Sequence, residues 1–244
     1  MEGSMKPKSD NLFHFTKSLD VLQLILKNGI QPRYCLEDIE WFGVESDKHI
    51  AFPMSCFCDI PLSRISEHTD FYGSFGLGLS KNWGYKNGLN PVIYSPEGGV
   101  AQSLAKYLFY FNFNNLSDKD HQRFSDHLFE YWSIVKPVKG KMVVSGSIVE
   151  KEFYQENEWR FVPPVRDLLF QEQFEDKKER ANKEIEKFAL EMSPNDIKYI
   201  FVRSDSDIPQ LVDFINTELG RFPLNDLKIL LSRIVSLDTL KKDL

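Results

Sequence analysis

Residues 11–16, Asn11-Leu12-Phe13-His14-Phe15-Thr16, have the apolar and aromatic composition of a buried β-strand. Ser18 follows as a typical helix N-cap, the apolar residues after it keep helical spacing, and Gly29 is a typical helix stop. The chain therefore opens with a strand and a short capped helix. Because side chains alternate along a strand, His14 and Thr16 are expected on one face of it.

The rest of the chain alternates short strands with helices. Residues 30–48 are predicted to be irregular, because Pro32 is followed there by an acidic patch. Apolar runs predict strands at 50–60, 75–80, 91–94, 141–148, 159–162 and 197–202. Helical spacing predicts helices at 65–72, 81–85, 100–111, 118–135, 171–192, 208–219 and 224–240.

This order of elements predicts an α+β fold built on a mixed sheet of short strands. Residues 11–244 are expected to form one domain, preceded by a flexible segment at 1–10. Residues 99–136 are expected to be a helical block inserted between sheet segments. Residues 171–244 are expected to be mainly helical. The highly charged helix at 171–192 is expected to expose most of its surface to solvent and to carry a thin apolar stripe.

Composition excludes several classes of protein. A formal charge of −6 over 244 residues argues against a surface that grips nucleic acid throughout. No run approaches the roughly 18 apolar residues of a membrane span, and residues 1–10 do not resemble a secretory signal. Three cysteines, Cys35, Cys56 and Cys58, are too few for a disulfide framework, and the Cys56-x-Cys58 spacing is atypical of zinc sites. We therefore expect a soluble cytoplasmic protein without a bound metal.

Two motifs combine side chains that suit cleavage of the glycosidic bond of NAD. His14 on the first strand could orient a ribose, and Glu158 on a late strand could stabilise an oxocarbenium-like transition state. Glu156 is expected on the same strand face as Glu158. The candidate catalytic residues are Glu158, His14 and Tyr72, the last as a stacking partner for nicotinamide. The candidate cofactor-binding residues are His14, Thr16, Ser55, Ser80 and Arg160.

Each of these residues also has a purely structural interpretation. His14 could be a hydrogen-bonded histidine inside a strand, and Thr16 could begin the first helix. Tyr72 could be a core tyrosine. Glu158 and Arg160 could form an ordinary cross-strand charge arrangement. Alternation also puts Arg160 on the same strand face as Glu158, where it could bind a phosphate or merely orient the carboxylate.

Several blocks of the chain resemble the bacterial abortive-infection AbiGi family. They are Leu12–Thr16, Leu26–Ile30, Met54–Leu62, His68, Tyr72–Gly73, Phe75–Leu79, Lys81–Gly84 and Asn90–Tyr94, with a further match at Glu156–Phe161. The resemblance covers residues 11–94 closely. It implies a role in defence against phage, in a toxin–antitoxin setting in which the family is regarded as the antitoxin.

More distantly, the opening of the chain is similar to ADP-ribosyltransferase folds that begin with a His-x-Thr strand. That similarity implies that His14 and Thr16 hold the ribose of NAD and that Glu158 is catalytic. Tyr72 and the strand 75–80 both remain candidates for the middle motif, because no Ser-Thr-Ser occurs.

The expected function is phage defence with an ADP-ribosyltransferase-like site that transfers ADP-ribose from NAD to a protein, a nucleic acid or water. The alternative is a catalytically inactive antitoxin or interaction module. The expected partners are a toxin or antitoxin protein and a phage component that acts as the trigger. Binding to a membrane is not expected.

Overall fold

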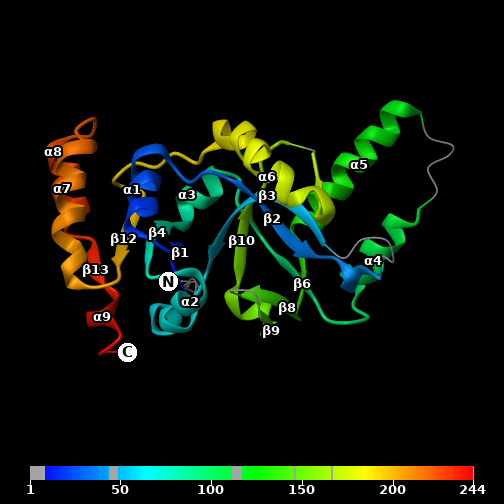
Figure 1. The fold of residues 1–244 in the computed structure, drawn as a ribbon, viewed down its shortest axis with the longest axis horizontal. Helices are drawn as coiled ribbons and strands as arrows, with labels where there is room; N and C mark the ends of the chain where they lie inside the picture. The colour runs from blue at the N-terminus through cyan, green and yellow to red at the C-terminus, as the bar shows by residue number, and fades with distance from the viewer. Residues whose placement is uncertain (1–8, 44–48, 112–116, 145–146, 166, 244) are drawn as a thin grey trace, which may run out of the picture. The chain divides into compact units, whose positions relative to one another are not determined.

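The computed structural model describes residues 9–43, 49–111, 117–144, 147–165 and 167–243 (Figure 1). The described chain forms two compact units, each assembled from separate segments. Unit 1 comprises residues 1–31, 56–89 and 189–244, and unit 2 comprises 32–55 and 90–188. Both contain helices and strands, so the predicted α+β character is confirmed. That residues 11–244 make one domain stays a prediction, and residues 1–8 of the predicted flexible segment lie outside the described residues.

Unit 1 is built on a mixed sheet whose strand order is β13-β12-β4-β1-β3. The central strand β1 (Asn11–Thr16) is antiparallel to β4 (Phe75–Ser80), with His14 opposite Leu77. On the far side of β4, β12 (Ile197–Val202) is antiparallel to β4 and parallel to β13 (Ile234–Ser236). The end of β3 (His49–Cys58) flanks β1 on its other side. The predicted first strand is therefore confirmed as an interior strand.

The helix after β1 begins and ends where the sequence predicts. In α1 (Leu19–Asn28) the Ser18 hydroxyl accepts a hydrogen bond from the Val21 amide, and the Gly29 amide donates to the Ile25 carbonyl. The other helices of unit 1 are η2 (Leu62–Arg64), α2 (Ile65–Tyr72), α3 (Lys81–Lys86), η5 (Asp205–Asp207), α7 (Ile208–Glu218), α8 (Leu224–Leu231) and α9 (Leu237–Leu240).

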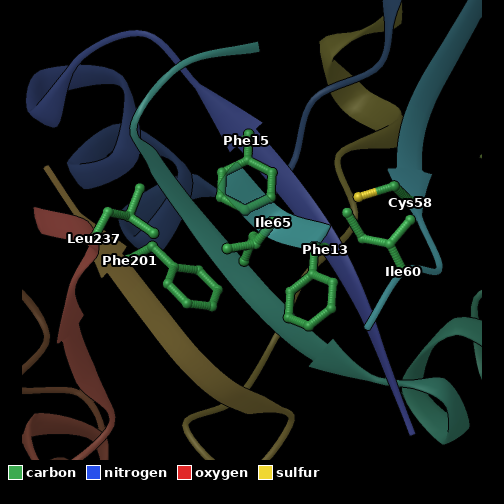
Figure 2. Close-up of a cluster of buried hydrophobic side chains, with 7 residues drawn as sticks. All are labelled: Phe13, Phe15, Cys58, Ile60, Ile65, Phe201 and Leu237. Carbon is green, nitrogen blue, oxygen red and sulfur yellow. The ribbon is translucent and has the colours of Figure 1, made fainter. Parts of the chain in front are cut away.

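One face of the unit 1 sheet carries an aromatic core. Figure 2 shows Phe13 and Phe15 of β1 pointing to the same side as Phe201 of β12 and Ile65 of α2. The Phe13 and Phe201 rings lie 5.8 Å apart between centroids, and both side chains are almost fully buried. Burying each such side chain contributes about 1.5–3 kcal/mol to the free energy of unfolding. Since Phe13 and Phe15 face this core, the intervening His14 faces the opposite side of the sheet.

The C-terminal residues correct one prediction. A single helix was expected over 224–240, but β13 separates α8 from α9. Ile234 and Val235 of β13 lie opposite Ile200 and Phe201 of β12. The apolar residues do keep a spacing of three to four, but pairing with a sheet edge that already exists outweighs the local helical preference.

Unit 2 contains the first part of β3, and its strands correct a second prediction. Residues 30–48 were expected to be irregular, but β2 (Arg33–Asp38) is antiparallel to β3, with Leu36 opposite Ala51. The short β11 (Leu169–Phe170) also pairs with β3. The remaining pairs are β10 (Glu158–Phe161) with β5 (Asn90–Pro91), β6 (Ile93–Ser95) with β7 (Val135–Pro137), and β8 (Lys139–Val144) with β9 (Ser147–Glu152).

Three predicted helices of unit 2 are confirmed, as α4 (Val100–Phe109), α5 (Asp118–Ser133) and α6 (Gln171–Ile185), and the short η4 (Glu186–Phe188) follows α6. Two 3-10 helices were not predicted: η1 (Glu40–Phe42), which lies in the stretch expected to be irregular, and η3 (Phe153–Glu156). The predicted helix at 171–192 is shorter than expected, but its apolar stripe is confirmed: Phe174, Ala181 and Ile185 pack with Tyr34 and Ala51. The Asn182 side chain also accepts a hydrogen bond from the Tyr34 amide at 2.8 Å.

Candidate functional site

The candidate catalytic carboxylate, Glu158, lies in a buried salt bridge on β10. Glu158 and Arg160 share one face of the strand, as alternation predicts. Arg160 Nε lies 2.8 Å from Glu158 Oε1, and Nη2 lies 3.1 Å from Oε2. This is a bidentate arrangement, the strongest form of carboxylate–guanidinium contact. The Arg160 side chain is 0% exposed, so the pair is shielded from solvent.

Two further charged side chains complete what we call the ion cluster, made of Glu37, Lys136, Glu158 and Arg160. Lys136 Nζ lies 3.2 Å from Glu158 Oε2 and 3.8 Å from Glu37 Oε2. Arg160 Nη2 also donates to Glu37 Oε1 at 3.0 Å, and Nη1 donates to the Ser133 carbonyl at 2.7 Å. Two carboxylates therefore balance two cations, which is the condition for keeping charges buried.

The electrostatics of the cluster keep Lys136 charged. Burial opposes the charge on Lys136, but the carboxylates of Glu158 and Glu37 outweigh it and raise the pKa of the amine. Tyr94 accepts a hydrogen bond from the Glu158 amide at 2.8 Å. Burial, and next the Glu158 carboxylate, raise the pKa of the Tyr94 phenol, so Tyr94 stays neutral. Both carboxylate oxygens of Glu158 thus accept hydrogen bonds from Arg160 or Lys136. A substrate that approaches the carboxylate would have to displace one of these two cations.

Glu156 does not share the strand face of Glu158, contrary to the prediction. It ends the 3-10 helix η3, and Asn157 follows with φ 45° and ψ 53°, in the left-handed region. That reversal breaks the alternation on which the prediction rested. Glu156 is nevertheless buried, with Oε1 2.5 Å from Lys151 Nζ.

His14 is held in place on the face of β1 opposite the aromatic core. Its Nδ1 lies 2.8 Å from the Cys56 carbonyl, and its ring contacts Phe57 at 5.4 Å between centroids. Because a carbonyl only accepts, Nδ1 is the donor, and in the neutral ring Nε2 is then an acceptor. Burial lowers the pKa of the imidazole, and the bond to Cys56 offsets only part of that effect. Thr16 shares this face, as predicted.

The structure does not bring Tyr72 beside His14. Tyr72 ends α2, and its ring stacks on His68 with centroids 4.4 Å apart. His68 in turn contacts Phe15, and Tyr72 packs against the aromatic core. Tyr72 therefore lies on the Phe15 side of β1, whereas His14 faces the other side.

The two candidate serines have different surroundings. The Ser80 hydroxyl accepts a hydrogen bond from the Trp83 amide at 3.3 Å and thereby caps α3. Ser55 is buried in β3, and its hydroxyl has no hydrogen-bond partner among the described residues.

The candidate site residues divide between the two units. Unit 1 contains His14, Thr16, Tyr72 and Ser80, and unit 2 contains Ser55, Glu158 and Arg160. Sequence reasoning missed Lys136, Glu37 and Tyr94 as neighbours of Glu158. Glu37 stood out only as part of an acidic patch, and nothing local to Lys136 marks it as buried.

In the part of the chain that the structure describes, no three His, Cys, Asp or Glu side chains are grouped so that they could hold a metal ion. None of the described helices is long and apolar enough to cross a membrane.

Comparison with known proteins assigns the chain to a class and then to a family. Both matches are to abortive phage resistance proteins. The family described as "Putative abortive phage resistance protein AbiGi, antitoxin" matches residues 28–203. The chain is also 30% identical to the "Abortive phage resistance protein AbiGi" of Lactococcus lactis subsp. cremoris, over 87% of this chain and 98% of that protein. The chain belongs to the AbiGi family. No solved structure matches it.

Proposed function

We propose that this chain acts in the cytoplasm as the antitoxin of an abortive-infection system, and that it neutralises a partner toxin by binding it. The observation that carries the proposal is the state of Glu158. A catalytic carboxylate has to face the reacting atoms, whereas both oxygens of Glu158 accept from Arg160 and Lys136 inside unit 2. The description of the matching family as an antitoxin supports the same function.

Growth of cells that express the chain alone tests this proposal. An antitoxin without turnover leaves growth unchanged, both for the wild type and for Glu158→Gln. The same cells, given the toxin of the same defence locus, should survive only when the chain is present. Growth arrest caused by the wild-type chain alone, and relieved by Glu158→Gln, would contradict the antitoxin function.

A second candidate is an ADP-ribosyltransferase-like enzyme that uses NAD. The geometry of His14 favours it: a neutral ring fixed through Nδ1 presents Nε2 as an acceptor for a ribose hydroxyl. In that reaction the bond between nicotinamide and ribose C1′ breaks, a bond from C1′ to the acceptor forms, and the acceptor loses a proton. The acceptor would be a protein, a nucleic acid or water, and a phage component would trigger the reaction.

Release of nicotinamide from NAD tests the enzymatic candidate. The purified chain is mixed with NAD, with and without a lysate of phage-infected cells, and nicotinamide is measured by chromatography. Glu156→Gln is the matched control for Glu158→Gln, because Glu156 is also buried and ion-paired. Turnover that is lost in Glu158→Gln and kept in Glu156→Gln would establish the enzyme. The absence of turnover and of NAD binding would leave the antitoxin function.

A further inference from the structure

Helix α4 is apolar on both of its faces. On the inner face Ala105 is fully buried, and the helix packs against β6 and η1 of unit 2. The outer face carries Val100, Leu104 and Tyr107, spaced four and three residues apart, and Phe111 continues this row just after the helix. An amphipathic surface helix would place polar residues on that outer face. We call these four residues, together with Tyr110, the α4 patch.

The α4 patch is strongly exposed. Val100 is 87% exposed, Tyr107 62% and Leu104 44%. At the C-terminal end of the patch, the Phe111 ring packs edge-on against Tyr107 and stacks on Phe124 of α5, with centroids 5.8 and 6.2 Å apart. These contacts hold the aromatic side chains in place. A contiguous exposed apolar patch of this kind marks an interaction surface.

The charge pattern indicates what kind of surface can cover the patch. Charged residues make up 27% of the chain, yet residues 98–111 contain a single one, Lys106. Each copy of the chain carries a net charge of −6. The net charges of two copies therefore repel each other. The α4 patch contains no acidic side chain and therefore adds nothing to this repulsion.

We propose that the α4 patch is the interface of a two-fold symmetric homodimer, in which α4 of one copy packs against α4 of the other. A helix with an apolar row at three-to-four spacing complements its own surface, as a two-fold interface requires. The patch exposes roughly 500 Å² per copy, since each aromatic side chain alone can bury 150–250 Å². Two copies then remove roughly 1,000 Å² of accessible surface, which is about the smallest area that a specific interface buries.

The molar mass in solution tests the dimer. Size-exclusion chromatography with light scattering should give about 57 kDa for the wild type, twice the 28.5 kDa of one chain. Val100→Glu and Tyr107→Glu should each weaken the dimer at least 100-fold and elute at 28.5 kDa with an unchanged far-ultraviolet spectrum. Leu24→Glu is the matched control, because Leu24 of α1 is 57% exposed outside the patch, and it should remain dimeric.

Two outcomes would overturn the proposal. One is a wild-type chain whose molar mass stays at 28.5 kDa up to high micromolar concentration. The chain would then be a monomer, and the α4 patch would bind a different protein. The other is a dimer that both patch variants retain. A cysteine at the patch gives a second measurement, in which Leu104→Cys should form a covalent dimer on mild oxidation and Leu24→Cys should not. Equal crosslinking of the two variants would also count against the interface.

Discussion

Replacement of Arg160 by methionine would remove a cation from the ion cluster while keeping most of the side-chain volume. Glu158 would lose its bidentate partner, and Glu37 would lose its contact at 3.0 Å. Lys136 alone would then face two carboxylates in a buried site. Removing one partner from a buried charge pair costs about 3–5 kcal/mol of the free energy of unfolding. For a chain of this size, that loss lowers the melting temperature by roughly 10 °C.

Urea unfolding followed by tryptophan fluorescence would measure this loss. Trp41, Trp132 and Trp159 lie in unit 2 with the cluster, so the signal reports mainly on that unit. Arg180→Met is the matched control. Its pair with Glu184 is a surface pair between residues four apart on α6, with side chains 88% and 61% exposed, and such pairs contribute no more than about 0.5 kcal/mol.

A double variant tests the reasoning itself. Arg160→Met combined with Glu158→Leu leaves Lys136 and Glu37 as a balanced pair 3.8 Å apart. Because no unpaired charge then remains buried, the double variant should be more stable than Arg160→Met alone. The account of the cluster would be refuted if Arg160→Met cost less than about 1 kcal/mol. It would also be refuted if the two substitutions simply added their losses.

Three further predictions concern single side chains. Burial lowers the pKa of His14, so its neutral form stabilises the fold above the ordinary value of 6.5. That stability should be lost as the pH falls below 6.5, and denaturation of His14→Gln, unlike that of His121→Gln, should lack this dependence. Burial and then Asp167 raise the pKa of Tyr34 to about 12 from 10, so the folded state should lose stability between pH 10 and 12. Absorbance at 295 nm should show that late ionisation, and Tyr34→Phe should remove one tyrosine from it, while the ionisation of Tyr94, whose pKa is also raised, remains. Gly73 has φ +112°, and an added Cβ would lie 2.3 Å from the Thr16 carbonyl. Gly73→Ala should therefore cost about 2 kcal/mol or more in urea unfolding, whereas Gly220→Ala, in open space, should cost little.

Much of the fold could be predicted from the sequence, because local signals agreed with the tertiary context. The first strand, the cap at Ser18 and the stop at Gly29 depend on hydrogen bonds within a few residues, so a local pattern is sufficient to locate them. The pairing of Glu158 with Arg160 also followed from the alternation of a strand.

The tertiary structure decided the remaining features, because they depend on residues far apart in the chain. The helical spacing of residues 224–240 gave way to β13, since β12 offered an edge with which Ile234 and Val235 could pair. Glu156 left the strand face because Asn157 turns the backbone. Glu158 is bound by Lys136, 22 residues away, and Arg160 by Glu37, 123 residues away. A sequence read in local windows contains no signal for contacts at that separation, and these contacts determine the chemistry open to Glu158.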